Sequence, residues 1–106
     1  MKIRYSPAAK EKLKIVKANA GGEMTSRITK SIGMLKSNPF MGASVEDVTV
    51  ISNDYRYIYV AHNFVFYRIG KGNIYIVDIY HERENFVEKL FGVSLRSRES
   101  IDFWGE

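Results

Sequence analysis

The chain has 106 residues, a length that suits one domain built around a single hydrophobic core. It is 45% hydrophobic and 26% charged, as globular proteins are, and the lack of cysteine excludes disulfides and thiolate metal sites. No stretch has the apolar length of a signal peptide or membrane span, so we expect a cytoplasmic protein with no membrane partner. Residues 1–36 hold nine of the 16 Lys and Arg residues and two acidic residues, a net charge of +7 that suits an anionic partner or a solvated helix surface.

The first elements are predicted from alternation and from a helix-start signal. Ile3 and Tyr5 alternate with basic residues, which predicts a short strand over residues 2–5. Ser6 and Pro7 then predict a helix start, because serine caps free N–H groups and proline fits the first turn. An apolar stripe at helical spacing follows, formed by Ala9, Leu13, Val16 and Ala20.

A second helix is predicted directly after the first. Gly21 and Gly22 end the first helix, because glycine adopts the left-handed cap without strain. The next apolar stripe consists of Met24, Ile28, Ile32 and Leu35. Pro39 ends this helix by forcing the preceding residue toward an extended conformation. Residues 7–38 are therefore predicted to form an antiparallel helical hairpin.

The second half of the chain is predicted to be mainly strands. Residues 40–54 form a connection with a short strand at 48–51, and β-branched and aromatic residues predict strands at 55–61, 64–69 and 74–80. The predicted turns are His62-Asn63 and residues 70–73. A short helix is predicted over residues 82–91, with Glu82 and Glu84 in its first turn and Gly92 as its cap. In the tail, Ile101, Phe103 and Trp104 predict docking on the domain or on a partner.

Together these elements predict an α+β fold. The N-terminal strand is followed by an antiparallel helical hairpin packed on a three- to four-stranded, mainly antiparallel sheet, and a short C-terminal helix ends the domain. We expect one domain over residues 1–92 and a tail over residues 93–106. The sequence shows no repeat and no second domain.

Pairing the strands across the predicted turns sorts their side chains onto two faces. Tyr59 is expected opposite Phe66, and Phe66 opposite Val77. The face toward the hairpin is predicted to carry Ile58, Val60, Val65, Tyr67, Ile69, Ile74 and Ile76, with Asp78 at its edge. The opposite face is predicted to carry Tyr57, Tyr59, Phe64, Phe66, Arg68, Tyr75, Val77, Ile79 and His81. An aromatic face of this kind is expected to be covered by RNA, by a protein, or by the end of the chain.

The order of elements and three short motifs resemble the RelE/ParE superfamily of bacterial toxins. The motifs are Tyr55-Arg56, Phe64-Val65-Phe66-Tyr67-Arg68 and Ile79-Tyr80-His81-Glu82-Arg83. The resemblance covers about residues 2–92 and implies the toxin of a type II toxin–antitoxin pair, which a cognate antitoxin wraps and neutralises. It implies no cofactor or metal, and a dimer or a toxin–antitoxin hetero-oligomer is compatible with it.

The two branches of this superfamily imply different targets. The ParE branch poisons DNA gyrase without catalytic residues, whereas the RelE branch is a ribosome-dependent endoribonuclease that cuts messenger RNA. Messenger cleavage without a metal would use His81, Arg68 and Arg83 as acid–base and phosphate-binding groups. Phe64 stands where the nuclease branch commonly presents arginine, which favours the ParE branch. A non-toxic binding module of the same fold is the third alternative.

The candidate contacts with a target or with RNA are Arg56, Tyr57, Tyr59, Phe64 and Tyr75. Each candidate also has a purely structural interpretation. His81 could bond a loop carbonyl, Arg68 could pair with Asp78 or Glu82, and Arg56 could pair with Asp54 or Glu46. The tyrosines could simply pack within the sheet.

Overall fold

The computed structural model describes residues 1–49 and 51–91, so the predicted docking of the tail and the cap at Gly92 lie outside the described residues. The elements are β1 (Lys2–Tyr5), α1 (Pro7–Ala20), α2 (Gly22–Met34), β2 (Ala43–Ser44), α3 (Val45–Val48), β3 (Arg56–Val60), β4 (Asn63–Gly70), β5 (Asn73–His81) and α4 (Phe86–Phe91). The strands form one five-stranded sheet in the order β1-β5-β4-β3-β2, in which β1 runs parallel to β5 and the other pairs are antiparallel. The predicted α+β class is confirmed, and β2 is a fifth strand that the sequence did not indicate.

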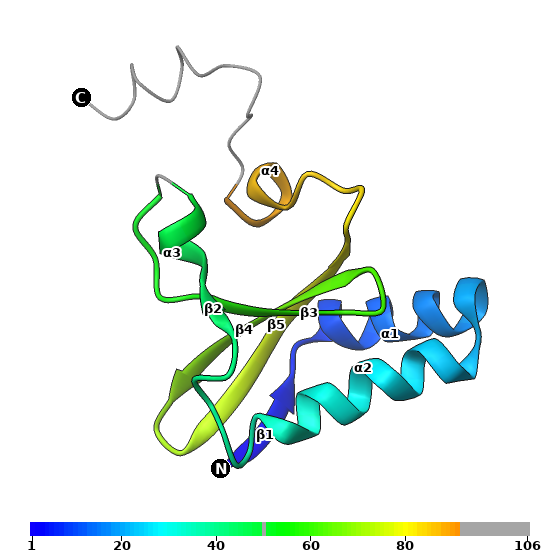
Figure 1. The fold of residues 1–106 in the computed structure, drawn as a ribbon, viewed down its shortest axis with the longest axis horizontal. Coiled ribbons are helices and arrows are strands. Elements are labelled where there is room, and N and C mark those ends of the chain that lie inside the picture. The colour runs from blue at the N-terminus through cyan, green and yellow to red at the C-terminus, as the bar shows by residue number, and fades with distance from the viewer. Residues whose placement is uncertain (50, 92–106) are drawn as a thin grey trace.

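The sheet separates two groups of helices. The hairpin of α1 and α2 lies on one side, and the short helices α3 and α4 lie on the other (Figure 1). The far end of the hairpin, where α1 turns into α2, extends past the end of the sheet (Figure 1). Within residues 1–49 and 51–91, one apolar cluster therefore lies on each face of the sheet.

The hairpin forms where the sequence predicts it. Ser6 caps α1, because its Oγ accepts a hydrogen bond from the Ala9 N–H at 3.0 Å. Gly21 joins the two helices with a φ of 87°, a conformation that glycine adopts without strain. Helix α2 ends at Met34, before the predicted boundary, and a turn over residues 35–37 leads to Pro39.

The larger core lies between the hairpin and the sheet. Its fully buried members include Ala9, Ile28, Ile32 and Leu35 of the helical segment and Val65, Tyr67, Ile74 and Ile76 of the sheet. Burial of one large aliphatic side chain contributes about 1.5–3 kcal/mol, so this interface fixes the hairpin firmly on the sheet.

The turn between β3 and β4 differs from the predicted one. The turn residues are Ala61 and His62, with φ values of 51° and 63°, whereas Asn63 already belongs to β4. Tyr59 consequently lies opposite Phe64 and not opposite Phe66. This changes the register by two residues, and because side chains alternate with a period of two, the predicted face of each β3 side chain is retained.

A β-bulge in β5 changes the faces at the end of that strand. Tyr67 pairs with Ile76 but Phe66 pairs with Asp78, so Val77 is an extra residue. Beyond the bulge, Ile79 turns to the hairpin side and is buried there, whereas Asp78 lies on the opposite face. The predicted positions of Ile79, His81 and Asp78 are therefore wrong.

The connection between α2 and β3 also differs from the prediction. The expected strand over residues 48–51 is wrong, because Val48 ends the helical turn α3 and the actual short strand is β2. Tyr67 holds this connection to the core: its hydroxyl donates to the Pro39 carbonyl at 2.7 Å and accepts from the Gly42 N–H at 3.1 Å.

Helix α4 begins later than predicted. It starts at Phe86, and the Asn85 side chain accepts from the Glu88 N–H at 3.2 Å, which caps the helix. Glu82 and Glu84 precede the helix, so the prediction that they lie in its first turn is wrong.

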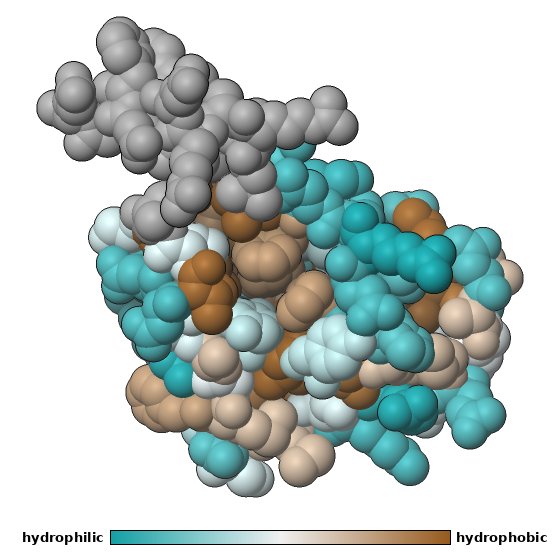
Figure 2. All heavy atoms as spheres, turned by 45° about the horizontal axis from the view of Figure 1, so that its top comes forward, coloured by the Kyte–Doolittle hydropathy of each residue, from teal (hydrophilic) through white to brown (hydrophobic). Residues whose placement is uncertain are grey.

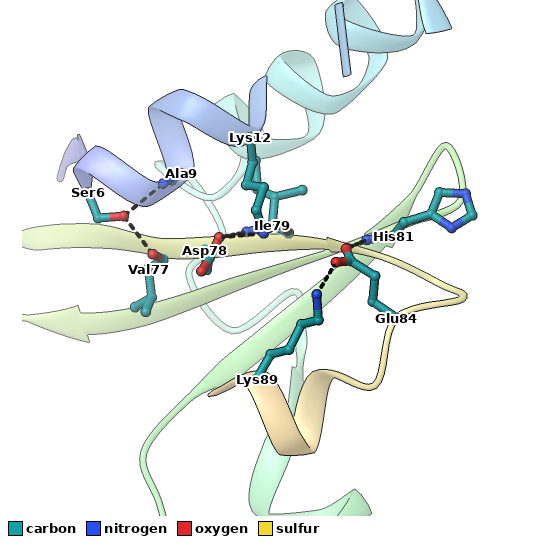
Figure 3. A network of polar contacts seen from close by, with 9 residues as sticks. All are labelled: Ser6, Ala9, Lys12, Val77, Asp78, Ile79, His81, Glu84 and Lys89. Carbon is teal, nitrogen blue, oxygen red and sulfur yellow. Dashed lines mark hydrogen bonds and ion pairs between the residues drawn. The ribbon is translucent and has the colours of Figure 1, made fainter. Parts of the chain in front are cut away.

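Side chains cover part of the outer edge of β5. Strand β1 pairs with residues 73–76, and past that point Ser6 Oγ donates to the Val77 carbonyl at 2.6 Å. Lys12 Nζ donates to the Ile79 carbonyl at 3.0 Å (Figure 3). The backbone acceptors at this edge are thus occupied although no strand of the described part of the chain lies beside them.

Candidate functional site

The sheet face opposite the hairpin, here called the aromatic face, carries the largest group of predicted site residues. Register places Tyr57, Tyr59, Phe64, Phe66, Arg68, Tyr75 and Tyr80 on it. Figure 2 views the molecule with the side of α3 and α4 tilted toward the reader. Hydrophobic residues lie at the middle of this view, with hydrophilic residues on either side. The predicted shared face of the tyrosines and Phe64 is therefore present.

Helices of the same chain cover the centre of this face. Phe66 is fully buried, with its ring centroid 5.1 Å from that of Phe86 on α4 and 5.7 Å from that of Tyr80. Phe64 lies 5.5 Å from the same Phe86 ring, and Val45 of α3 is fully buried in this cluster. The centre of the aromatic face is thus a second small core. The exposed residues around it, among them Tyr59, Arg68 and Tyr75, are here called the rim, and they are the part open to a partner.

Tyr59 is the most prominent aromatic residue of this rim. It is 51% exposed, and its hydroxyl donates to Oε2 of Glu82. The other carboxylate oxygen of Glu82 lies 2.9 Å from Nδ1 of His62. The Tyr59 hydrogen bond lowers the pKa of Glu82, and the same carboxylate raises the pKa of the Tyr59 hydroxyl. A charged carboxylate therefore holds the exposed phenol ring in one orientation.

Arg68 and Tyr75 form the opposite part of the rim. They face each other across β4 and β5, and Tyr75 is 40% exposed. Arg68 donates to Asp54 Oδ2 at 2.7 Å, and its guanidinium carbon lies 5.6 Å from the centroid of the Tyr55 ring. The hydrogen bond from Arg68 lowers the pKa of Asp54. The partner of Arg68 is thus neither Asp78 nor Glu82.

His81 lies away from the aromatic face. It pairs with Asn63 on the hairpin side at one end of β4, whereas Arg68 faces Tyr75 near the other end. The His81 ring accepts from the backbone N–H of Arg83 at 3.2 Å. The expectation that His81 and Arg68 project from the same face is wrong, and the bulge at Val77 is the reason. The structure does not bring His81, Arg68 and Arg83 around one point.

Arg56 serves the connection between α2 and β3. Its Nη2 donates to the carbonyl of Gly42 and, at 3.4 Å, to that of Phe40. The Phe40 ring, 69% exposed, lies with its centroid 5.2 Å from the guanidinium carbon. These contacts make Arg56 a structural residue here, with partners other than the expected Asp54 or Glu46.

Two members of the rim, His62 and Glu82, were not predicted as site residues. They are 20 positions apart and meet because the β3–β4 turn lies beside the end of β5, where the Glu82 N–H donates to the His62 carbonyl at 2.9 Å. The sequence contained no local signal for this contact. In residues 1–49 and 51–91, no group of three His, Asp or Glu side chains is arranged to hold a metal ion, and no helix is long and apolar enough to cross a membrane.

Comparison with known proteins identifies relatives of this fold. A family model described as the ParE toxin of the type II toxin–antitoxin system parDE matches residues 3–86. Among solved structures, the chromosomal ParDE toxin–antitoxin system from P. aeruginosa matches with a TM-score of 0.60 and 15% sequence identity. The match covers 76% of this chain and 95% of that chain, and at this identity it shows the fold alone. No curated protein matches the chain.

Proposed function

The chain belongs to the ParE toxin family of type II toxin–antitoxin systems, and from this premise we propose that it arrests growth by binding DNA gyrase until a cognate antitoxin neutralises it. Inhibition by binding needs an exposed complementary surface and no acid–base pair. The gyrase target would place the protein in the cytoplasm. The neighbouring reading frame is the natural candidate for the antitoxin.

The separation of His81 from Arg68 is the observation that favours gyrase over messenger RNA as the target. Cleavage of RNA without a metal requires an acid or base and a phosphate-binding cation around the same phosphate. His81 lies on the hairpin side, and Arg68 lies on the other face with its guanidinium bonded to Asp54. This arrangement supports a binding role over a catalytic one.

We infer that the rim of the aromatic face contacts the target. Tyr59 and Tyr75 are its exposed aromatic rings, with Arg68 on the same face. Tyrosine and arginine dominate the binding energy of many protein interfaces. Tyr59 is also held in place by Glu82, so little side-chain freedom is lost when it binds. Phe64 packs against the Tyr59 ring, with 5.2 Å between the centroids, and Tyr57 packs against Phe64 at 5.7 Å.

The first prediction concerns Tyr59. Purified protein is expected to inhibit supercoiling by gyrase, and Tyr59→Ala to raise the half-inhibitory concentration by about tenfold or more, the effect of losing one interface anchor. Met34→Ala is the matched control, because Met34 is 58% exposed but lies on the hairpin. It should inhibit like the parent protein.

The supercoiling assay and two further experiments distinguish the alternatives. No inhibition at excess protein would remove the gyrase target. Messenger 5′ ends mapped after induction test the nuclease alternative: new ends that vanish in both His81→Ala and Arg68→Ala would favour it. Normal growth under strong expression without an antitoxin would instead favour a non-toxic binding module.

A further inference from the structure

Basic side chains surround Tyr75 at one end of the aromatic face. In β1, Ile3 and Tyr5 pack against the larger core, so the alternate residues Lys2 and Arg4 lie on the opposite face of the sheet. Register places Arg4 directly beside Tyr75 of β5. Strand β1 thus adds two cations to the aromatic face, where the predicted strand pairing did not place them.

The other side of Tyr75 is basic as well. Arg68 faces Tyr75 from β4, and Lys71 in the β4–β5 turn lines a hollow of about 220 Å³ together with these two residues. The Asn73 side chain donates to the Tyr75 hydroxyl oxygen at 3.2 Å, which holds the ring from the side of the turn. The four cations and the ring at their centre are here called the basic patch: Lys2, Arg4, Arg68, Lys71 and Tyr75.

The cations of the basic patch are available to an anion. Lys2, Arg4 and Lys71 are exposed, and within residues 1–49 and 51–91 none of them forms an ion pair. Arg68 pairs with Asp54, but the two side chains are 50% and 66% exposed. An ion pair this exposed is weak, so a phosphate can compete with Asp54 for the guanidinium. The patch therefore attracts a ligand that carries several negative charges.

The arrangement of the patch fits a nucleotide better than an acidic protein segment. Arg4, Tyr75 and Arg68 lie side by side on three neighbouring strands, which places the two arginines two strand spacings, about 10 Å, apart. A base can stack on an exposed aromatic ring, and a nucleotide within a chain has a phosphate on either side of its base. A base on Tyr75 thus brings one phosphate toward each arginine. Carboxylates would use the cations but leave the ring unused.

We propose that the basic patch binds single-stranded DNA, with one base stacked on Tyr75 and the flanking phosphates on Arg4 and Arg68. A single strand is required because the bases of a duplex stack on each other. The choice of DNA rests on the proposed function, since the proposed target acts on DNA. The contact of the rim with the target then has two parts: Tyr59 contacts gyrase itself, and the basic patch contacts a strand of the DNA that gyrase holds.

The first test measures binding of the full chain to a fluorescein-labelled oligothymidylate of about 12 nucleotides, a length within the range that one small domain covers. Fluorescence anisotropy is recorded at several salt concentrations. Tyr75→Ala should weaken binding about tenfold, as the loss of one stacked base does, and leave the salt dependence unchanged. Tyr75→Phe retains the ring and should bind like the parent protein. Equal affinity of the parent and Tyr75→Ala would refute the stacking.

The second test concerns the phosphates. Arg4→Gln should reduce the slope of log affinity against log salt concentration by about 0.7, the contribution of one phosphate contact with a single strand. Arg27→Gln is the matched control, because Arg27 is an exposed arginine of α2 on the other side of the sheet. It removes the same charge and should bind like the parent protein. Equal losses in the two variants would show attraction to the net charge alone and contradict the proposal.

Competition identifies the ligand. Oligouridylate of the same length, duplex DNA and polyglutamate are each added to the complex with labelled oligothymidylate. Unlabelled oligothymidylate should displace the probe at a lower concentration than any of them. More effective displacement by the RNA, by the duplex or by polyglutamate would assign the patch to that ligand and overturn the proposal.

The outcomes for the parent chain separate this proposal from the proposed function. A parent chain that binds oligothymidylate but does not inhibit supercoiling overturns the proposed function and leaves the DNA site in place. A parent chain that inhibits supercoiling but does not bind oligothymidylate overturns the DNA site alone.

Discussion

Gly42→Ala is expected to destabilise the protein by about 3 kcal/mol, near the upper end of the usual cost of overpacking a buried site. A Cβ at this position would lie 2.7 Å from the Tyr67 hydroxyl oxygen and closer still to the Tyr57 carbonyl oxygen. Neither neighbour can move freely, because Tyr57 belongs to β3 and the Tyr67 hydroxyl bonds both Pro39 and Gly42 itself. Urea denaturation followed by circular dichroism measures the loss.

Gly33→Ala is the matched control for this prediction. A Cβ at Gly33 meets no atom within 4 Å, and the residue lies exposed in α2. Alanine should stabilise that helix by about 0.8 kcal/mol relative to glycine. Changes of the same sign and size in the two variants would contradict the assigned role of Gly42.

Phe66→Ala should cost about 3–5 kcal/mol, the range found when a buried phenylalanine is truncated to alanine. The Phe66 ring is fully buried and lies within 5.7 Å, between centroids, of both Phe86 and Tyr80. Its loss leaves a cavity beneath α4 that two short helices cannot collapse to fill. The variant should therefore unfold at lower urea concentration and inhibit gyrase less, because Tyr59 and Phe64 rest on the same cluster.

Phe40→Ala provides the comparison for Phe66→Ala. Phe40 has the same side chain but is 69% exposed, so its truncation should change stability by less than about 1 kcal/mol. Equal losses from the two substitutions would mean that α4 does not rest on Phe66 in solution.

The helical hairpin and the strands β1, β3, β4 and β5 were predictable because each depends on local pattern. The serine cap at Ser6, the glycine at position 21 and the apolar stripes fix the hairpin without reference to the rest of the chain. The turn at Ala61 and His62 was misplaced because asparagine is the usual turn residue with positive φ, and here Ala61 adopts that conformation instead.

Strict alternation along β5 misses the β-bulge at Val77, and this omission has the largest effect on the predicted site. Strict alternation placed Asp78 on the buried face, where an unpaired carboxylate is costly. That conflict indicates an irregularity in the strand. One extra residue at Val77 moves Asp78 to the aromatic face and Ile79 to the hairpin side. His81 then changes face together with Ile79, which removes it from the side of Arg68. The contact of Tyr59 with Glu82 depends on this same strand end and could not be predicted from local pattern.

The side chains along the outer edge of β5 bear on how the free protein behaves in solution. Exposed strand edges promote polymerisation, because an unpaired backbone acceptor readily recruits a strand from another molecule. Ser6 and Lys12 occupy the acceptors of Val77 and Ile79, and the charge of Lys12 further discourages such recruitment. These contacts therefore disfavour the addition of a strand from another molecule at this part of β5.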